Sequence, residues 1–338
     1  LAFLPGEGEI RRTAAHLAGS LPDGCHLRPL FGAMDIAAQR AAIAPEVSGR
    51  KVVLATSIAE TSLTLPDIRV VVDGGRARRA RFDPASGMSR LVTERVTRAE
   101  AAQRQGRAGR VAPGVCYRLW TRGEEGALAA FPPPEIAAAD LAPLALELAL
   151  WGSDALAFLT PPPPPALAEA RMLLAGLGAL EGGRITPHGR ALAALPLHPR
   201  LGHMLLVADG SPDAPLMAAL LADRDPLRGA PPDLALRLAA LRDPARHNVD
   251  RGTSDRIRLE ARRLARLAPK GNGALSPGAL AALAYPDRIG LRRKGEAPRW
   301  LLASGKGAVM EPGLPLSGEP MLVATDLDGD PREARIRQ

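Results

Sequence analysis

The sequence predicts a multidomain chain in which a parallel α/β sheet domain is followed by helical segments and a β-rich segment. Residues 1–122 alternate short apolar strands with helical patterns, which is typical of a parallel sheet flanked by helices. Prolines at 132–134 break this alternation, and helical spacing then continues until Gly and Pro cluster at 269–277. With 338 residues, of which 46% are apolar, the chain is long enough for roughly two to three domains.

The elements of the first domain follow from apolar runs and their boundaries. The run 51–55 is β-branched and ends in small hydroxyl residues, as expected for a buried parallel strand that delivers a polar loop at its carboxyl end. Residues 74–96 alternate basic and apolar residues around 83–87, the profile of a protruding hairpin with a turn at its tip. The expected strands are 1–4, 26–31, 51–55, 69–73 and 115–120, and the expected helices are 7–21, 36–43 and 97–106.

Two helices and a small hairpin are expected after the first domain. An apolar helix covers 136–151, five prolines at 161–165 form a stiff linker, and a second helix covers 166–180. A short hairpin follows at 181–186. Two helices with a small β-wing suit a winged helix.

The remainder is predicted to be a small helical bundle and a β segment. Apolar spacing is helical from 199 to 268, with interruptions at prolines. The strand-like runs that follow resemble the beginning of an OB-like barrel, a fold that often holds single-stranded nucleic acid. These runs are 300–303, 308–310 and 321–324. The expected domains are therefore 1–122, 123–192 (winged helix), 193–268 (helical bundle) and 269–338 (an incomplete OB-like segment).

The segment 103–110, Gln-Arg-Gln-Gly-Arg-Ala-Gly-Arg, carries the strongest chemical signal. If it is helical, Gln103, Arg107 and Arg110 stand at i, i+4 and i+7 and present one amide and two guanidinium groups on one face. The guanidinium group of arginine can donate two hydrogen bonds at once to phosphate oxygens. Glycine costs a helix interior about 1 kcal/mol relative to alanine, so Gly106 indicates close approach by a ligand or another backbone. The alternative interpretation is a solvated basic helix end.

Composition favours a polyanionic partner and argues against several other classes of protein. The net charge is +8, and 40 of the 44 basic residues are arginine. Cys25 and Cys116 fit reduced thiols in a cytoplasmic protein better than a disulfide framework. The six histidines show no ligand spacing, and no apolar run reaches the length that spans a membrane.

Taken in order, several segments resemble motifs of the DEAH-box superfamily 2 helicases. Residues 51–75 are similar to motif V and 103–110 to motif VI, while 1–10 look like motif IV and 29–34 like the element called IVa. The stretch 177–201 is similar to the passage from winged helix to ratchet domain in the same enzymes. The resemblance implies that the first domain is a second RecA-like helicase domain and that the bundle is ratchet-like, the HA2 region.

The resemblance also implies roles for residues near a nucleotide. Gln103 would position the attacking water or touch the γ-phosphate, and Arg107 and Arg110 would act as arginine fingers across the cleft from a first RecA-like domain. Ser62 would sense the nucleotide state, and Asp67 would contact the ribose. The alternative for Ser62 is a purely structural role.

A separate set of residues is expected to bind nucleic acid. By the same resemblance, Thr56 and Ser57 would hydrogen-bond phosphates, whereas the alternative is that they cap the short helix that follows. The basic hairpin would hold the strand, with Arg78, Arg79 and Arg81 as its main contacts. The expected partner is single-stranded or partly duplex RNA, or DNA.

Two family motifs do not occur in these residues. The sequence contains neither a phosphate loop nor an Asp-Glu dipeptide. Both would lie on a first RecA-like domain preceding Leu1, so the chain is expected to be the C-terminal part of an ATP-dependent 3′–5′ helicase. The full-length enzyme would use ATP and Mg²⁺, with the Mg²⁺ ligands outside this chain, and the chain alone would be inactive. The alternatives are a non-catalytic nucleic-acid-binding or regulatory module and an unrelated basic scaffold.

Overall fold

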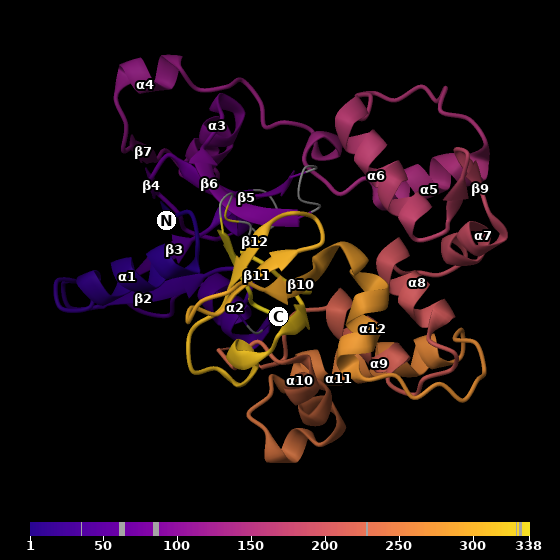
Figure 1. The fold of residues 1–338 in the computed structure, drawn as a ribbon. Coiled ribbons are helices and arrows are strands. Elements are labelled where there is room, and N and C mark those ends of the chain that lie inside the picture. Colours follow the sequence, from indigo (N-terminus) through magenta and orange to yellow (C-terminus); the bar gives the residue numbers. More distant parts are fainter. Residues whose placement is uncertain (35, 61–64, 84–87, 228, 329, 331–332) are drawn as a thin grey trace. The chain divides into compact units, whose positions relative to one another are not determined.

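The computed structural model describes the chain except for residues 35, 61–64, 84–87, 228, 329 and 331–332 (Figure 1). The described residues divide into two compact units. The first unit comprises 1–80 and 91–134, and the second comprises 81–90 and 135–338. The first unit therefore continues beyond the expected boundary at 122.

A five-stranded parallel sheet forms the centre of the first unit, with the strand order β2-β3-β1-β4-β7. Phe3 lies opposite both Ala55 and Asp73, so the carboxyl ends of the three central strands meet at one edge. This arrangement confirms the predicted parallel sheet, with strand ends that differ from the expected ones by one or two residues. The strands are β1 (Ala2–Phe3), β2 (Cys25–Leu30), β3 (Arg50–Ala55), β4 (Val70–Asp73) and β7 (Val115–Arg118).

Helices cover both faces of this sheet. Leu54 packs against Ile10 of α1, whereas its neighbours Val53 and Ala55 pack in a different cluster with Ala42 of α2. Successive residues of a strand point to opposite faces, so a strand buried on both sides must be continuously apolar. The helices are α1 (Glu7–Leu17), α2 (Ile36–Ile43), α3 (Arg98–Gly106) and α4 (Arg122–Gly126).

The predicted hairpin is present as β5 (Arg76–Asp83) paired with β6 (Met88–Arg95). Its turn at 84–87 lies outside the described residues. Residues 81–90 group with the second unit, where the backbone N–H of Phe82 donates to the carbonyl of Ala138 at 2.9 Å. The hairpin strands therefore contribute to both units.

After residue 135, the second unit has three helices and a hairpin of two short strands, each two residues long, and these elements share one core. Helix α5 starts at Ala142 rather than at 136, because Pro143 lies in its first turn and residues 135–137 form a separate 3₁₀ turn. The five prolines at 161–165 do not all belong to a linker, because Pro164 and Pro165 begin α6. In the first turn of a helix the backbone N–H has no partner within the helix, so proline is tolerated there. The elements are α5 (Ala142–Trp151), α6 (Pro164–Gly176), β8 (Leu180–Glu181), β9 (Arg184–Ile185) and α7 (Pro187–Ala193).

In the described part of the chain, five further helices share a second core. That core includes Leu280, Ala281 and Ala284 of the last helix, so it extends past the expected boundary at 268. The helices are α8 (Pro199–Val207), α9 (Ala214–Ala222), α10 (Leu234–Arg242), α11 (Arg251–Ala265) and α12 (Pro277–Ala284).

The last segment is a five-stranded sheet with its own core around Trp300. The Trp300 side chain is fully buried, and its indole N–H donates to the Glu319 carbonyl at 3.0 Å. Neighbouring strands are antiparallel except for β12 and β14, which are parallel. The order is β13-β10-β11-β12-β14, with β10 (Ile289–Arg292), β11 (Arg299–Leu302), β12 (Gly307–Val309), β13 (Met321–Val323) and β14 (Glu333–Arg335).

Candidate functional site

An open hollow at the end of α3 gathers the residues that the sequence singled out. Gln103, Gly106, Arg107 and Arg110 line it together with Glu60, which follows β3. The helix does not continue through this segment, because α3 ends at Gly106 and Arg107 is its C-cap. The premise of one helical face through Arg110 is therefore wrong, yet the turn after the helix brings the same side chains to one surface.

The Glu60 main chain orients Arg107. Its carbonyl oxygen accepts hydrogen bonds from Nε of Arg107, at 2.8 Å, and from Nη2. Burial and the nearby charge of Arg110 lower the pKa of the Arg107 guanidinium. Two guanidinium groups that repel each other make the hollow electropositive, so an anion that enters it is attracted by both.

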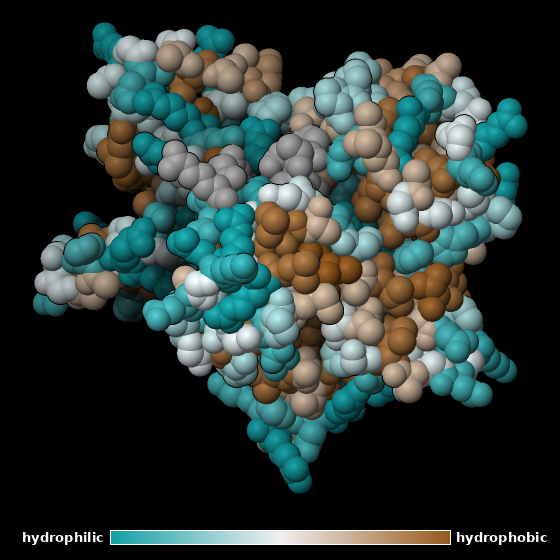
Figure 2. All heavy atoms as spheres, viewed as in Figure 1, coloured by the Kyte–Doolittle hydropathy of each residue, from teal (hydrophilic) through white to brown (hydrophobic). Residues whose placement is uncertain are grey.

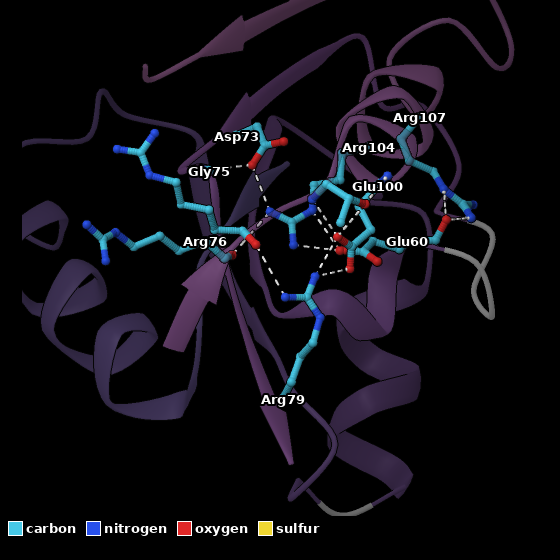
Figure 3. Close-up of polar contacts among 10 residues, drawn as sticks. Glu60, Asp73, Gly75, Arg76, Arg79, Glu100, Arg104 and Arg107 are labelled. Carbon is cyan, nitrogen blue, oxygen red and sulfur yellow. Dashed lines mark hydrogen bonds and ion pairs between the residues drawn. The ribbon is translucent and has the colours of Figure 1, made fainter. Parts of the chain in front are cut away.

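Behind the hollow lies a buried ion network centred on Arg104 (Figure 3). The Arg104 side chain is fully buried, with Nε 2.7 Å from Oε1 of Glu60 and Nη1 2.7 Å from Oδ1 of Asp73. Nη1 also donates to the main-chain oxygen of Arg76 at 3.3 Å, and the guanidinium lies 4.8 Å from the Phe3 ring centroid. Burial raises the pKa of the Glu60 carboxyl despite the opposing charge of Arg104. Arg104 therefore joins the segment that follows β3, the end of β4 and the start of the hairpin.

Sequence reasoning missed this network, although a signal was present. Ala101 stands three residues before Arg104 within α3, and both are buried. Residues at this spacing share a helix face, so Arg104 lies on the buried side of α3. An arginine on an apolar helix face indicates a buried ion pair.

A second set of ion pairs, centred on Arg79, joins the hairpin to the start of α3. Nη2 of Arg79 lies 2.5 Å from both carboxylate oxygens of Glu100, and Nη1 lies 3.0 Å from Glu94. Glu100 in turn completes a capping box with Thr97. Burial raises the pKa of Glu100, but the hydrogen bonds from Thr97 and Arg79 outweigh it and hold that pKa below its ordinary value. The Arg79 side chain is only 17% exposed, so in this structure it braces the hairpin.

The other residues predicted to bind nucleic acid differ in their surroundings. Arg78 forms a surface ion pair with Glu9 at 3.3 Å, a kind of contact that stabilises little and that a phosphate can replace. Arg81 is half-buried and belongs to the second unit. Thr56 and Ser57 lie at the carboxyl edge of the sheet, with Ser57 exposed. The Thr56 side chain makes no capping hydrogen bond to the 3₁₀ helix Ser57–Ala59, which speaks against the capping alternative.

Two further nucleotide contacts were predicted, Ser62 and Asp67. Ser62 falls outside the described residues. Asp67 is exposed, has a φ of 63°, and is not among the residues that line the hollow.

In the described part of the chain, no three or more His, Cys, Asp or Glu side chains gather to hold a metal ion. No helix in that part is long and apolar enough to cross a membrane.

Comparison with known proteins places these features in a family. Residues 8–112 match the model of the helicase conserved C-terminal domain. The chain is 41% identical over 329 residues to the ATP-dependent RNA helicase HrpB of Escherichia coli, which covers 96% of this chain and 39% of HrpB. It is 36% identical over 217 residues to HrpA of the same organism, covering 62% of this chain and 17% of HrpA. For the mouse probable RNA helicase DHX34, the identity is 37% over 214 residues, covering 61% of this chain and 19% of DHX34.

The fold agrees with the sequence comparison. A crystal structure of E. coli HrpB superposes with a TM-score of 0.85 and 40% sequence identity, covering 99% of this chain and 41% of the HrpB chain. The present chain thus spans about two fifths of the length of HrpB. With the matching domain model, the identity along nearly the whole chain and the shared fold, the chain belongs to the DExH/DEAH helicase family, and it corresponds to a part of HrpB that contains the helicase conserved C-terminal domain.

Proposed function

We propose that this chain is the C-terminal portion of an ATP-dependent RNA helicase that couples NTP hydrolysis to 3′–5′ movement along a strand and to unwinding. The observation that carries the proposal is the hollow in which Gln103, Arg107 and Arg110 meet. HrpB, described as an ATP-dependent RNA helicase, supports the reaction and the substrate class.

The chemistry of the hollow suits a phosphoryl transition state. Negative charge spreads over the γ-phosphoryl oxygens during transfer, and an arginine that offsets it accelerates the reaction by roughly 10³ to 10⁵. Arg107, oriented by the Glu60 carbonyl, and Arg110 supply two such groups. The Gln103 amide can both donate and accept, which suits a residue that orients the attacking water. Gly106 leaves open space beside these groups.

ATP hydrolysis also requires a phosphate loop and Mg²⁺ ligands. We assign both to a first RecA-like domain in cis, outside these residues. Ser62 and Asp67 stay predicted nucleotide contacts.

The carboxyl edge of the sheet is the proposed RNA side of the first unit. Thr56 and Ser57 offer hydroxyl donors to phosphates there, and Arg78 can exchange its Glu9 partner for a phosphate. We also propose that 123–192 form a winged helix, that 193–268 form a ratchet-like helical bundle, and that 269–338 form an OB-like segment. Three separate cores support three such domains, and the core of the bundle also includes α12.

The test is ATP hydrolysis by the full-length protein that contains this chain. Arg107→Ala and Arg110→Ala are each expected to lower kcat by roughly 100-fold or more while RNA binding is retained. Arg122→Ala is the control, because Arg122 is an exposed arginine outside the hollow. The 338-residue chain alone should show no RNA-stimulated hydrolysis.

Normal hydrolysis by both arginine variants would refute the proposed roles. A full-length protein that binds RNA but never hydrolyses ATP would favour the alternative, a non-catalytic RNA-binding module.

A further inference from the structure

The second unit has a groove of its own around the end of α5. Its volume is about 680 Å³, and its walls come from α5, α6, the β8–β9 hairpin and α7. Helix α5 ends at this groove because Gly152 takes a φ of 84°, a left-handed conformation that glycine adopts without strain. The lining residues are 148–154, Arg171, 183–185 and Arg190.

Trp151 is the most unusual residue of the groove. It is the last residue of α5 and is 72% exposed, although the same helix buries Ala142, Ala145, Leu146 and Leu148. The core of the unit therefore does not use its indole ring. A large aromatic side chain left in water costs free energy, and such residues concentrate at binding surfaces.

The charged residues of the groove are mainly basic. Arg184 and Arg190 are exposed, and neither has an acidic partner within ion-pair distance among the described residues, even though Glu181 lies opposite Arg184 in the hairpin. Arg171 is paired with Asp154 at 2.5 Å. Figure 2 shows hydrophobic and hydrophilic side chains side by side over the region where Figure 1 places α5, α6 and β9.

We infer that this groove binds single-stranded RNA, with Trp151 stacking on a base and Arg184 and Arg190 holding neighbouring phosphates. The inference rests on the proposed RNA helicase function and adds a contact outside the first unit. Proteins that bind single-stranded nucleic acid without sequence preference combine exposed aromatic rings, which stack on bases, with basic residues that contact phosphates. Trp151 and the two arginines without carboxylate partners provide this combination. An apolar peptide is a poorer occupant, because it would desolvate both guanidinium groups without offering them an anion.

The test uses the 338-residue chain and a fluorescently labelled oligouridylate. Trp151→Ala is expected to weaken binding about 5- to 150-fold, the range given by one base-stacking contact, while Trp151→Phe keeps most of the affinity. Of the three tryptophans, Trp300 is buried and Trp120 half-buried, so RNA should quench mainly the Trp151 fluorescence.

A charge variant tests the phosphate contacts. Each contact contributes roughly 0.7 to the dependence of log affinity on log salt for single strands, so Arg184→Gln with Arg190→Gln should reduce that slope by roughly 1.4. Arg246→Gln with Arg251→Gln removes the same charge from exposed positions outside the groove and is the matched control.

The outcomes separate this inference from the proposed function. If the wild-type chain binds RNA without quenching of Trp151 and the groove variants bind equally well, the groove is not an RNA site. If the wild-type chain binds no RNA, the inference also fails. The ATPase test of Arg107 and Arg110 decides the proposed function in either case.

Discussion

Replacing Arg104 with methionine should reveal how much the buried network stabilises the first unit. Methionine is a flexible, unbranched side chain that can occupy much of the same space, so the main loss is the guanidinium. Glu60 and Asp73 are 8% and 0% exposed, and both carboxylates would then lack their charged partner. Breaking a buried ion pair by removing one partner costs about 3–5 kcal/mol. Domains of this kind are stable by only about 5–15 kcal/mol, so Arg104→Met removes a large share of the stability.

Hydrogen exchange followed by mass spectrometry can measure this loss within the intact chain. Backbone amides of β3 and β4 that exchange through global opening of the first unit should do so about 150- to 5,000-fold faster, the factor that corresponds to 3–5 kcal/mol. Peptides from the second unit provide an internal reference. Arg98→Met is the matched control, because Arg98 is an exposed arginine at the start of the same helix.

A double variant tests the cause of the effect. If uncompensated charge destabilises the protein, then Glu60→Gln added to Arg104→Met should recover part of the loss. Exchange in the first unit that changes by less than about threefold in Arg104→Met would refute the reasoning, since the network would then contribute nothing measurable.

Two further predictions concern stability. The pKa of Glu100 lies below its ordinary value of 4.5, so its bonds to Arg79 and Thr97 stabilise the first unit above that pH, and the stabilisation is lost as the pH falls through the folded-state pKa. Glu100→Gln should therefore speed exchange at pH 7, with a difference from wild type that shrinks below pH 4.5; an undiminished difference would contradict this. Gly189→Ala places a Cβ 2.2 Å from the Ala179 carbonyl oxygen and should destabilise α5–α7 by about 1–3 kcal/mol, measured by the same exchange experiment. Gly176→Ala, which meets nothing within 4 Å, is the control, and equal effects of the two substitutions would exclude crowding as the cause.

The sheet of the first unit could be predicted closely from the sequence because its strands are buried on both faces. In the run 51–55, polar and apolar residues do not alternate, and hydroxyl residues follow the run. Both its parallel direction and its burial could therefore be predicted. Helix ends were harder to place. The repeating arginines suggested a helix through Arg110, but α3 stops at Gly106, since the turn geometry after it is set by packing against the sheet.

Only a part of the candidate site could be predicted from the sequence. Gln103, Arg107 and Arg110 were identified because their chemistry matches phosphate and because they stand close in sequence. Glu60 lies 44 residues from Arg104, so nothing local connects the two. Likewise Arg79 has the same local pattern as the other hairpin arginines, and only its distance to Glu100 reveals a bracing role.

Glu60 serves the two arginines through different parts of one residue. Its carboxylate holds Arg104, whereas its main-chain carbonyl holds Arg107. Every amino acid carries that carbonyl, so a substitution at position 60 can disturb the interior without removing the group that orients Arg107. The side chain at position 60 therefore governs the stability of the fold, while the orientation of Arg107 depends on the path of the backbone after β3.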